Sequence, residues 1–472
     1  MSFGSNGRDL TRGPVVGTLV SLAVPVFFAN LLQTAYQLVD TFWVGRIGPT
    51  AVAAVSLSFP VLFLLISLGG GLAIAGTILV AQYQGQGDRR QVDLVAGQTF
   101  LAMFASSALM TGAGYFLGGR LIRLMVRNGD AALVSLATVY LQWTFLGVLF
   151  LFTFFVFQSL MRGVGDVVTP LYIVGATVVL NLILDPLFIF HLKMGVAGAA
   201  VATVCTQGLA AGVALYLLFS GRHGIRLSLG ALRPRWPLLK KIFLLGAPAS
   251  LEQSSRALGI TMMAFLVAQY PTDVVAAYGV GGRVLSFVVI AALGLSMATS
   301  AMVGQNLGAG SKTRAAEAVQ IAARGGLVVL TLFGVAVLLG GEAIAAIFVP
   351  SGPAVIEESA LFLRIMAPTF GLIAVQQVLH GAFRGSGNTL TSMVLSLVSL
   401  WVLQFPLAFV LSGRAGLGPV GIWLSYPIAN LGAVLLAVLW FRRGTWNERR
   451  ITDELRLEEN VQVETMREIG VG

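Results

Sequence analysis

Twelve apolar runs, each long enough to cross the hydrocarbon core of a bilayer, dominate this sequence. A helix needs about 20 apolar residues to span ~30 Å of hydrocarbon, and helices satisfy all their backbone hydrogen bonds internally. The pattern therefore predicts an all-α integral membrane protein. The predicted spans are approximately 15–44, 51–81, 94–119, 135–160, 167–190, 195–220, 238–268, 275–303, 316–348, 358–382, 389–411 and 418–441.

Composition excludes the soluble classes. Apolar residues make up 57% of the chain and charged residues 11%, against roughly 45–50% and 25% in soluble domains. The single cysteine, Cys205, excludes a disulfide framework and a thiolate metal site. No Gly-Lys-Ser/Thr follows the glycines near Arg162 or Arg384, so these turns do not indicate phosphate binding. We expect no cofactor, no nucleic-acid partner and no enzymatic activity.

Basic residues are unequally divided between alternate loops. One side holds 14 Lys and Arg before the tail and the other holds 6, and an excess of this kind marks cytoplasmic loops. This asymmetry also accounts for the formal charge of +10. Both termini and the basic 221–241 linker are therefore predicted to be cytoplasmic, in a multi-pass protein of the plasma (inner) membrane that we expect to be a monomer.

An internal repeat organises the chain. Pro25 matches Pro248 and Gly195 matches Gly418, each pair 223 residues apart, and several glycine motifs recur at the same interval. The repeat predicts two homologous six-helix lobes, parallel because six helices return to the starting face. The predicted divisions are an N-terminal lobe (1–220), a basic linker (221–241), a C-terminal lobe (242–441) and a charged tail (442–472) that could form an amphipathic helix.

Two acids lie within predicted spans, where a charge is costly enough to indicate function. Asp40 lies about one turn before the outer end of the first span, and Asp185 lies at a similar level in the fifth. No Lys or Arg lies within a helical turn or two of Asp185 or of the buried side of Asp40, which argues against a purely structural ion pair. Tyr36 and Asn181 are each four residues from an acid and share its helix face.

Other polar residues fall near the same level of the predicted spans. Tyr140 lies near the outer start of the fourth span and Thr203 lies two turns into the sixth. Pro186 deprives the carbonyl of Leu182 of its helical partner. That oxygen, together with the acids, Asn181 and Thr203, supplies hard ligands suited to Na⁺ or to holding a proton. Gln33 and Gln158 could line a substrate cavity or could equally serve packing.

Four motifs carry a family resemblance. In chain order they are Gln33-x6-Asp40-Thr41, Ala81-Gln82-x-x-Gly85-x-Gly87, Arg162-Gly163-x-Gly165 and Asn181-x-x-x-Asp185-Pro186. With the duplicated six-helix plan, they resemble the multidrug and toxic compound extrusion (MATE) family, in its DinF-like and archaeal branch. The resemblance covers the chain except 442–472.

The resemblance implies two six-helix lobes flanking a central cavity, and export of mostly cationic, amphipathic compounds in exchange for H⁺ or Na⁺. By the same resemblance, Asp40, Asn181, Asp185 and Thr203 match the cation site of the N-terminal lobe. Tyr36, Tyr140, Gln33 and Gln158 are the expected substrate-cavity residues.

The C-terminal half keeps the glycines of the repeat but not its acids. Met263 falls opposite Asp40, and Phe405 opposite Asp185. Glu252 and Arg256 are spaced i,i+4 and predict an internally paired structural couple, with a coupling or substrate role as the alternative. We therefore expect cation chemistry to be confined to the N-terminal lobe.

Two other functions fit parts of the sequence. A flippase for lipids or lipid-linked compounds would need a strongly basic cavity, which Arg256, Arg283 and Arg364 suggest weakly. An intramembrane aspartyl protease would need a Gly-x-Gly-Asp motif, and Gly163-Val164-Gly165-Asp166 fits it literally. Asp166, however, lies in a predicted turn at the opposite face from Asp40. Efflux of cationic compounds remains the favoured function.

Overall fold

The computed structural model contains helices and turns throughout the residues that it describes, which are 9–126, 131–350, 352–447 and 451. The predicted 442–472 tail lies outside the described residues apart from 442–447 and Ile451. The helices are α1 (Val15–Gly45), α2 (Pro49–Gln86), α3 (Arg89–Met125), α4 (Ala131–Gly163), α5 (Val168–Pro186), α6 (Val196–Ser220), α7 (Trp236–Val267), α8 (Thr272–Gly308), α9 (Lys312–Phe348), α10 (Pro353–Met366), α11 (Phe370–Gly385), α12 (Thr389–Leu397), α13 (Phe405–Phe409) and α14 (Gly418–Arg442).

These fourteen helices make twelve spans, as the sequence predicts. α10 and α11 continue each other through a 3₁₀ turn, and α12 and α13 are joined by a π-helical segment. Eleven spans are apolar enough to be recognised by hydropathy alone in the described chain. The twelfth, α7, is less apolar because it carries Glu252 and Arg256. The fold is thus an all-α membrane protein with twelve transmembrane helices.

Most helices extend several residues beyond the predicted spans. α9 begins at Lys312 rather than 316, and α8 ends at Gly308 rather than 303. A helix of 37 residues is ~55 Å long, which exceeds the ~30 Å of hydrocarbon. The helical backbone hydrogen bonds therefore continue beyond the hydrocarbon layer into polar surroundings. Residues 236–241, assigned to the linker from the sequence, are the first turn and a half of α7.

Repeated glycines end corresponding helices in both halves. Gly87 and Gly310 both have a left-handed backbone (φ 76° and 82°), as do Gly165 and Gly387 (φ 83° and 88°). Glycine adopts this conformation without steric cost. The repeat therefore preserves these glycines for the turns between spans.

Contacts divide the chain into two compact units. Unit 1 contains Phe28–Ser250, and unit 2 contains Leu10–Phe27 and Leu251–Arg450. The division falls inside α1 and α7, in each case two residues after a proline (Pro25, Pro248). Unit 1 thus holds the start of α7, whereas unit 2 holds the start of α1.

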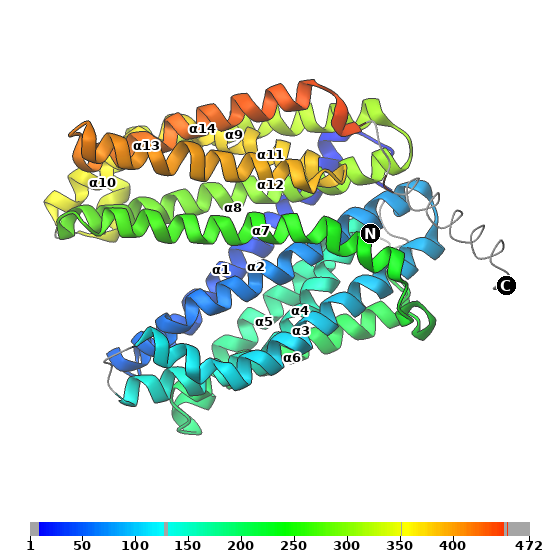
Figure 1. Ribbon diagram of the computed structural model, residues 1–472, viewed down its shortest axis with the longest axis horizontal. Coiled ribbons are helices and arrows are strands. Elements are labelled where there is room, and N and C mark those ends of the chain that lie inside the picture. The colour runs from blue at the N-terminus through cyan, green and yellow to red at the C-terminus, as the bar shows by residue number, and fades with distance from the viewer. Residues whose placement is uncertain (1–8, 127–130, 351, 448–450, 452–472) are drawn as a thin grey trace. The chain divides into compact units, whose positions relative to one another are not determined.

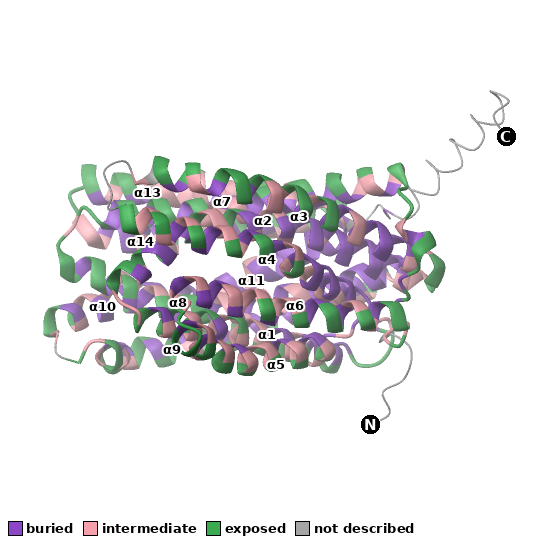
Figure 2. Cartoon of the chain, turned by 90° about the horizontal axis from the view of Figure 1, so that it is seen from below, coloured by how far each residue is buried: buried purple, intermediate pink, exposed green. Residues whose placement is uncertain are grey.

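The two units have the same internal plan (Figure 1). In unit 1, α4 packs against α2, α3 and α6, and in unit 2, α11 packs against α8, α9 and α14. Buried residues gather on these central helices, while the outer helices expose large apolar side chains (Figure 2). Leu339 of α9, for example, is 83% exposed. Exposed apolar surface of this extent fits contact with lipid.

Candidate functional site

Unit 1 contains an acid cluster formed by Asp40, Asn181 and Asp185. α1 carries Asp40, and the last turns of α5 carry the other two residues. Asn181 Nδ2 donates to Asp185 Oδ1 over 2.8 Å, and both side chains are fully buried. Asp40 lies close enough to act electrostatically on Asp185. The cluster forms because Asn181 and Asp185 are four residues apart on α5 and because α1 brings Asp40 close to them.

Two tyrosines border the acid cluster. Tyr36 lies one turn before Asp40, and its hydroxyl hydrogen-bonds to Thr206 Oγ1 at 2.7 Å. Tyr36 also contacts the side chain of Thr203, which is half-buried on α6. Tyr140 of α4 is buried and lies within electrostatic range of both acids. α1, α4, α5 and α6 thus all contribute side chains to this region.

Three oxygens of the acid cluster have no hydrogen-bond donor within the described part of the chain. They are Asp40 Oδ1, Asn181 Oδ1 and Asp185 Oδ2, and each is buried. The described residues also provide no ion pair to either acid. Buried polar atoms are normally satisfied, so unsatisfied oxygens grouped on neighbouring side chains are suited to bind a proton or a small cation.

The chain becomes π-helical directly after the acid cluster. α5 ends at Pro186, and the π-helix Leu187–His191 continues the span. Proline removes one backbone donor and disturbs the helical ladder, and π-helical turns often occur at functional sites. The backbone thus leaves α-helical geometry directly after Pro186.

Other polar residues named from the sequence lie differently. Gln33 is exposed on α1, and Gln158 is half-buried on α4. Neither forms a hydrogen bond to the acid cluster among the described residues. Thr206, which the sequence analysis did not single out, is the fully buried partner of Tyr36. The sequence signal for Thr206 was its position three residues after Thr203, which places both threonines on one face of the helix.

Unit 2 contains a different arrangement around a carboxylate, the Glu252 cluster. Arg256 Nη2 lies 2.9 Å from Glu252 Oε1, and Arg384 Nη2 donates to the same oxygen. Ser392 donates to Glu252 Oε2 over 2.9 Å, and His380 Nδ1 lies 2.8 Å from the Ser392 hydroxyl. Both oxygens of this buried carboxylate are occupied, and the two guanidinium groups outnumber it.

Arg384 joins this cluster although it lies beside the glycines of a predicted turn. It lies at the end of α11, only 8% of its side chain is exposed, and it reaches Glu252 on α7. The sequence separation of 132 residues hides this contact from any local pattern. At the repeat positions of the first-lobe acids, unit 2 has Met263, buried at 1% exposure, and Phe405.

The features that suggested other functions have local partners. Arg364 pairs with Glu342 at 2.7 Å, and Arg283 lies over the ring of Phe348. A strongly basic cavity is therefore not favoured.

The carboxylate of Asp166 is also engaged by local partners. Asp166 accepts from the Thr169 hydroxyl and lies 2.9 Å from His223 Nδ1. It also accepts from the backbone N–H groups of Val168 and Thr169 at the start of α5 and holds the segment after α6 through His223, which gives the protease motif a structural role.

A duplicated six-helix membrane fold whose described residues leave Asp40 and Asp185 of one half without an ion pair is typical of secondary transporters. The chain belongs to the MatE family, whose sequence model matches residues 25–187 and again 248–410. Members of this family are transporters.

Relatives and solved structures match almost the whole chain. The probable multidrug resistance protein YpnP of Bacillus subtilis is 30% identical over 94% of this chain and 99% of its own. The probable multidrug resistance protein NorM of Thermotoga maritima is 30% identical over 93% and 95%. A crystal structure of a MATE protein in complex with MaL6 superposes with a TM-score of 0.88, at 26% identity over 93% and 99%.

Proposed function

We propose that this protein is a multidrug efflux transporter that expels cationic, amphipathic compounds in exchange for H⁺ or Na⁺. The coupling ion binds at Asp40, Asn181, Asp185 and Thr203 in unit 1. Tyr36, Tyr140, Gln33 and Gln158 contact the substrate. Both termini face the cytoplasm, and the protein works as a monomer in the plasma (inner) membrane.

The contrast between the two carboxylate sites carries this proposal. Glu252 is saturated by two guanidinium groups and a hydroxyl, so a cation would have to displace fixed charges. The acid cluster instead has three buried oxygens without donors among the described residues. Only the unit 1 site therefore leaves lone pairs for a mobile cation.

Exchange follows if coupling ion and substrate compete for the negative charge of the acid cluster. A bound proton or Na⁺ neutralises the site, whereas a cationic substrate favours the free carboxylates. Each ligand must also bias the inward-open and outward-open states differently, since equal binding to both states drives nothing. Asp40 lies within electrostatic range of Asp185, so we expect the protonation of one acid to affect the other.

Energetics set a limit on the driving force. One charge crossing 100 mV is worth about 2.3 kcal/mol, somewhat under two decades of gradient at ~1.4 kcal/mol per decade. One-for-one exchange of H⁺ for a monovalent cation moves no net charge. The ion gradient alone then drives transport, unless more than one coupling ion moves per substrate.

Efflux from proteoliposomes with separately imposed pH and Na⁺ gradients tests the proposal. Asp40→Asn and Asp185→Asn should each abolish gradient-driven efflux, because the amide removes the charge at nearly constant volume. The double variant should lose little more than either single variant, since residues of one functional unit are non-additive. Glu342→Gln is the matched control, because this acid is exposed and paired with Arg364.

Two results would contradict the proposal. Normal transport by Asp185→Asn beside an inactive Asp40→Asn would replace the paired site with a single carboxylate. Uncoupled, gradient-independent movement of substrate in the unmodified protein would exclude antiport altogether.

A further inference from the structure

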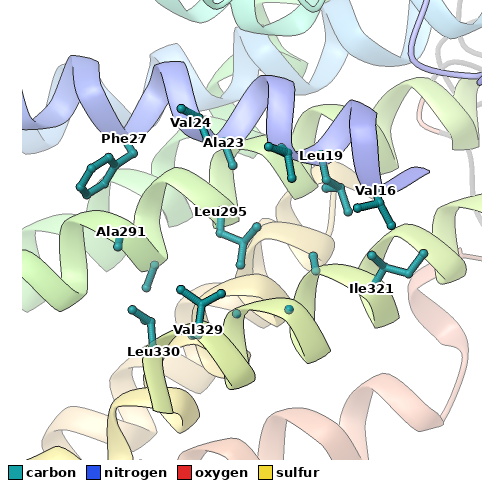
Figure 3. A pocket seen from close by; sticks show the side chains of 16 residues that line it. Val16, Leu19, Ala23, Val24, Phe27, Ala291, Leu295, Ile321, Val329 and Leu330 are labelled. Carbon is teal, nitrogen blue, oxygen red and sulfur yellow. The ribbon is translucent and has the colours of Figure 1, made fainter. Parts of the chain in front are cut away.

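A groove lined by apolar side chains runs along unit 2, with a volume of about 300 Å³. The first half of α1 forms one wall through Val16, Leu19 and Phe27, and α8 and α9 form the facing wall (Figure 3). Val16, 57% exposed, and its neighbours Val20 and Val24 leave the groove open toward the surroundings. In a bilayer, such a groove must be filled by hydrocarbon.

Glycine keeps part of the groove open. A Cβ at Gly325 of α9 would meet no atom within 4 Å, whereas one at the adjacent Gly326 would press on Leu295 and Ala374. Gly325 therefore faces free space and Gly326 serves close helix packing. The groove is wide at Gly325 because that position lacks a side chain.

Charges on α9 place the groove within the bilayer. Arg324 directly precedes Gly325, and the next charged residue of the helix is Glu342. The 17 uncharged residues between them extend about 25 Å along the axis, close to the ~30 Å of hydrocarbon. Gly325–Leu330 thus lie at the start of the hydrocarbon layer, and Arg324 lies at its interface with the headgroups.

Basic residues flank the groove toward the starts of α1 and α9: Arg12, Lys312 and Arg314 precede its lining residues, and Arg324 lies beside Gly325. Arg314 Nη2 donates to the carbonyls of Arg12 and Gly13 over 3.1 and 2.8 Å, which fixes the start of α1 against the start of α9. Lys312 and Arg324 are exposed, and Arg324 has no ion pair among the described residues.

Acidic residues only partly offset this charge. Glu317 is exposed on the same stretch of α9, and Asp9 precedes the start of α1. Among the described residues of unit 2 in these two segments, Arg12, Lys312, Arg314 and Arg324 outnumber Glu317, so this side of the groove has a net positive charge.

We propose that this groove binds one acyl chain of an anionic phospholipid whose phosphate lies against Arg324. Apolar lining alone would not select a ligand, because lipid tails are as apolar as the helix surface. The headgroup charge supplies the selectivity, since a Lys or Arg near the membrane surface attracts anionic lipids by about 1 kcal/mol, which is roughly fivefold in affinity. This site is separate from the acid cluster, so its test is independent of the transport proposal.

Native mass spectrometry of the purified full-length protein can count bound phosphatidylglycerol against phosphatidylcholine. The unmodified protein should retain one phosphatidylglycerol preferentially. Arg324→Gln should weaken it about fivefold without changing phosphatidylcholine binding, and Gly325→Phe should remove the bound lipid by filling the groove. Arg90→Gln removes an exposed charge in unit 1, and Gly212→Phe fills open space on α6. Both control variants should bind lipid as the unmodified protein does.

A second measurement requires no substitution in the groove. Phosphatidylglycerol with a photoreactive acyl chain should label Val16–Phe27 and Ile321–Leu330, as identified by peptide mapping. Equal retention of both lipids, or labelling elsewhere in the chain, would overturn the proposal. A change from dimer to monomer in Gly325→Phe would also overturn it, because the groove would then be an interface between two copies.

Discussion

Replacing Glu252 by glutamine should destabilise the protein strongly, because Glu252 is the only acid of its cluster. Its carboxylate is 1% exposed and interacts with Arg256, Arg384 and Ser392. The substitution keeps the volume but leaves two guanidinium groups facing a neutral amide. Breaking a buried ion pair from one side costs about 3–5 kcal/mol. We therefore expect Glu252→Gln to lower the free energy of unfolding by that amount.

Unfolding in a detergent titration, followed by circular dichroism, measures this loss. The double variant Glu252→Gln/Arg384→Met should recover a large part of it, because it also removes the arginine whose side chain is 8% exposed. The control is Glu342→Gln, since its pair with Arg364 is 66% and 51% exposed and such pairs contribute about 0–1 kcal/mol. A loss below about 1 kcal/mol in Glu252→Gln, or no recovery in the double variant, would refute the reasoning.

Two further predictions concern packing and topology. Gly71→Ala should destabilise unit 1 by about 1–3 kcal/mol, because the added Cβ would overlap the backbone of Ser250 and overpacking is costly. The control Gly112→Ala, which faces open space, should be neutral or slightly stabilising in the same detergent titration. Cysteines placed at Ser228 and Thr445 should resist impermeant thiol reagents in intact cells, and labelling of both from outside would reverse the predicted orientation.

The spans could be predicted because eleven of them are long apolar runs and α7 is a long, mostly apolar one, and length alone separates such runs from buried strands. Their ends could not, since a helix such as α9 continues past the hydrocarbon with charged residues on its first turns. The sequence indicated that the helix is disturbed at Pro186, but it did not indicate that the following segment is π-helical. Proline indicates that the helical backbone hydrogen bonds are interrupted there, but it does not specify how the chain accommodates the interruption.

Helical spacing identified the site residues that lie near each other on one helix. It could not identify their partners on other helices. Asn181 and Asp185 meet because four residues make about one turn. The partner of Tyr36 is Thr206, 170 residues away, and the partner of Glu252 is Arg384, 132 residues away. Contacts between distant helices depend on how the helices pack, and one sequence carries no direct signal of that.

The division of the chain inside α1 and α7 bears on how such a duplicated protein could arise. Leu10–Phe27 contacts unit 2 and the start of α7 contacts unit 1, and the repeat pairs these two segments through Pro25 and Pro248. The first segment of each sequence half therefore belongs to the compact unit that the other half mainly forms, as in a domain-swapped dimer. Gene fusion would have joined two such partners covalently, so neither half of the present chain contains all the residues of one compact unit.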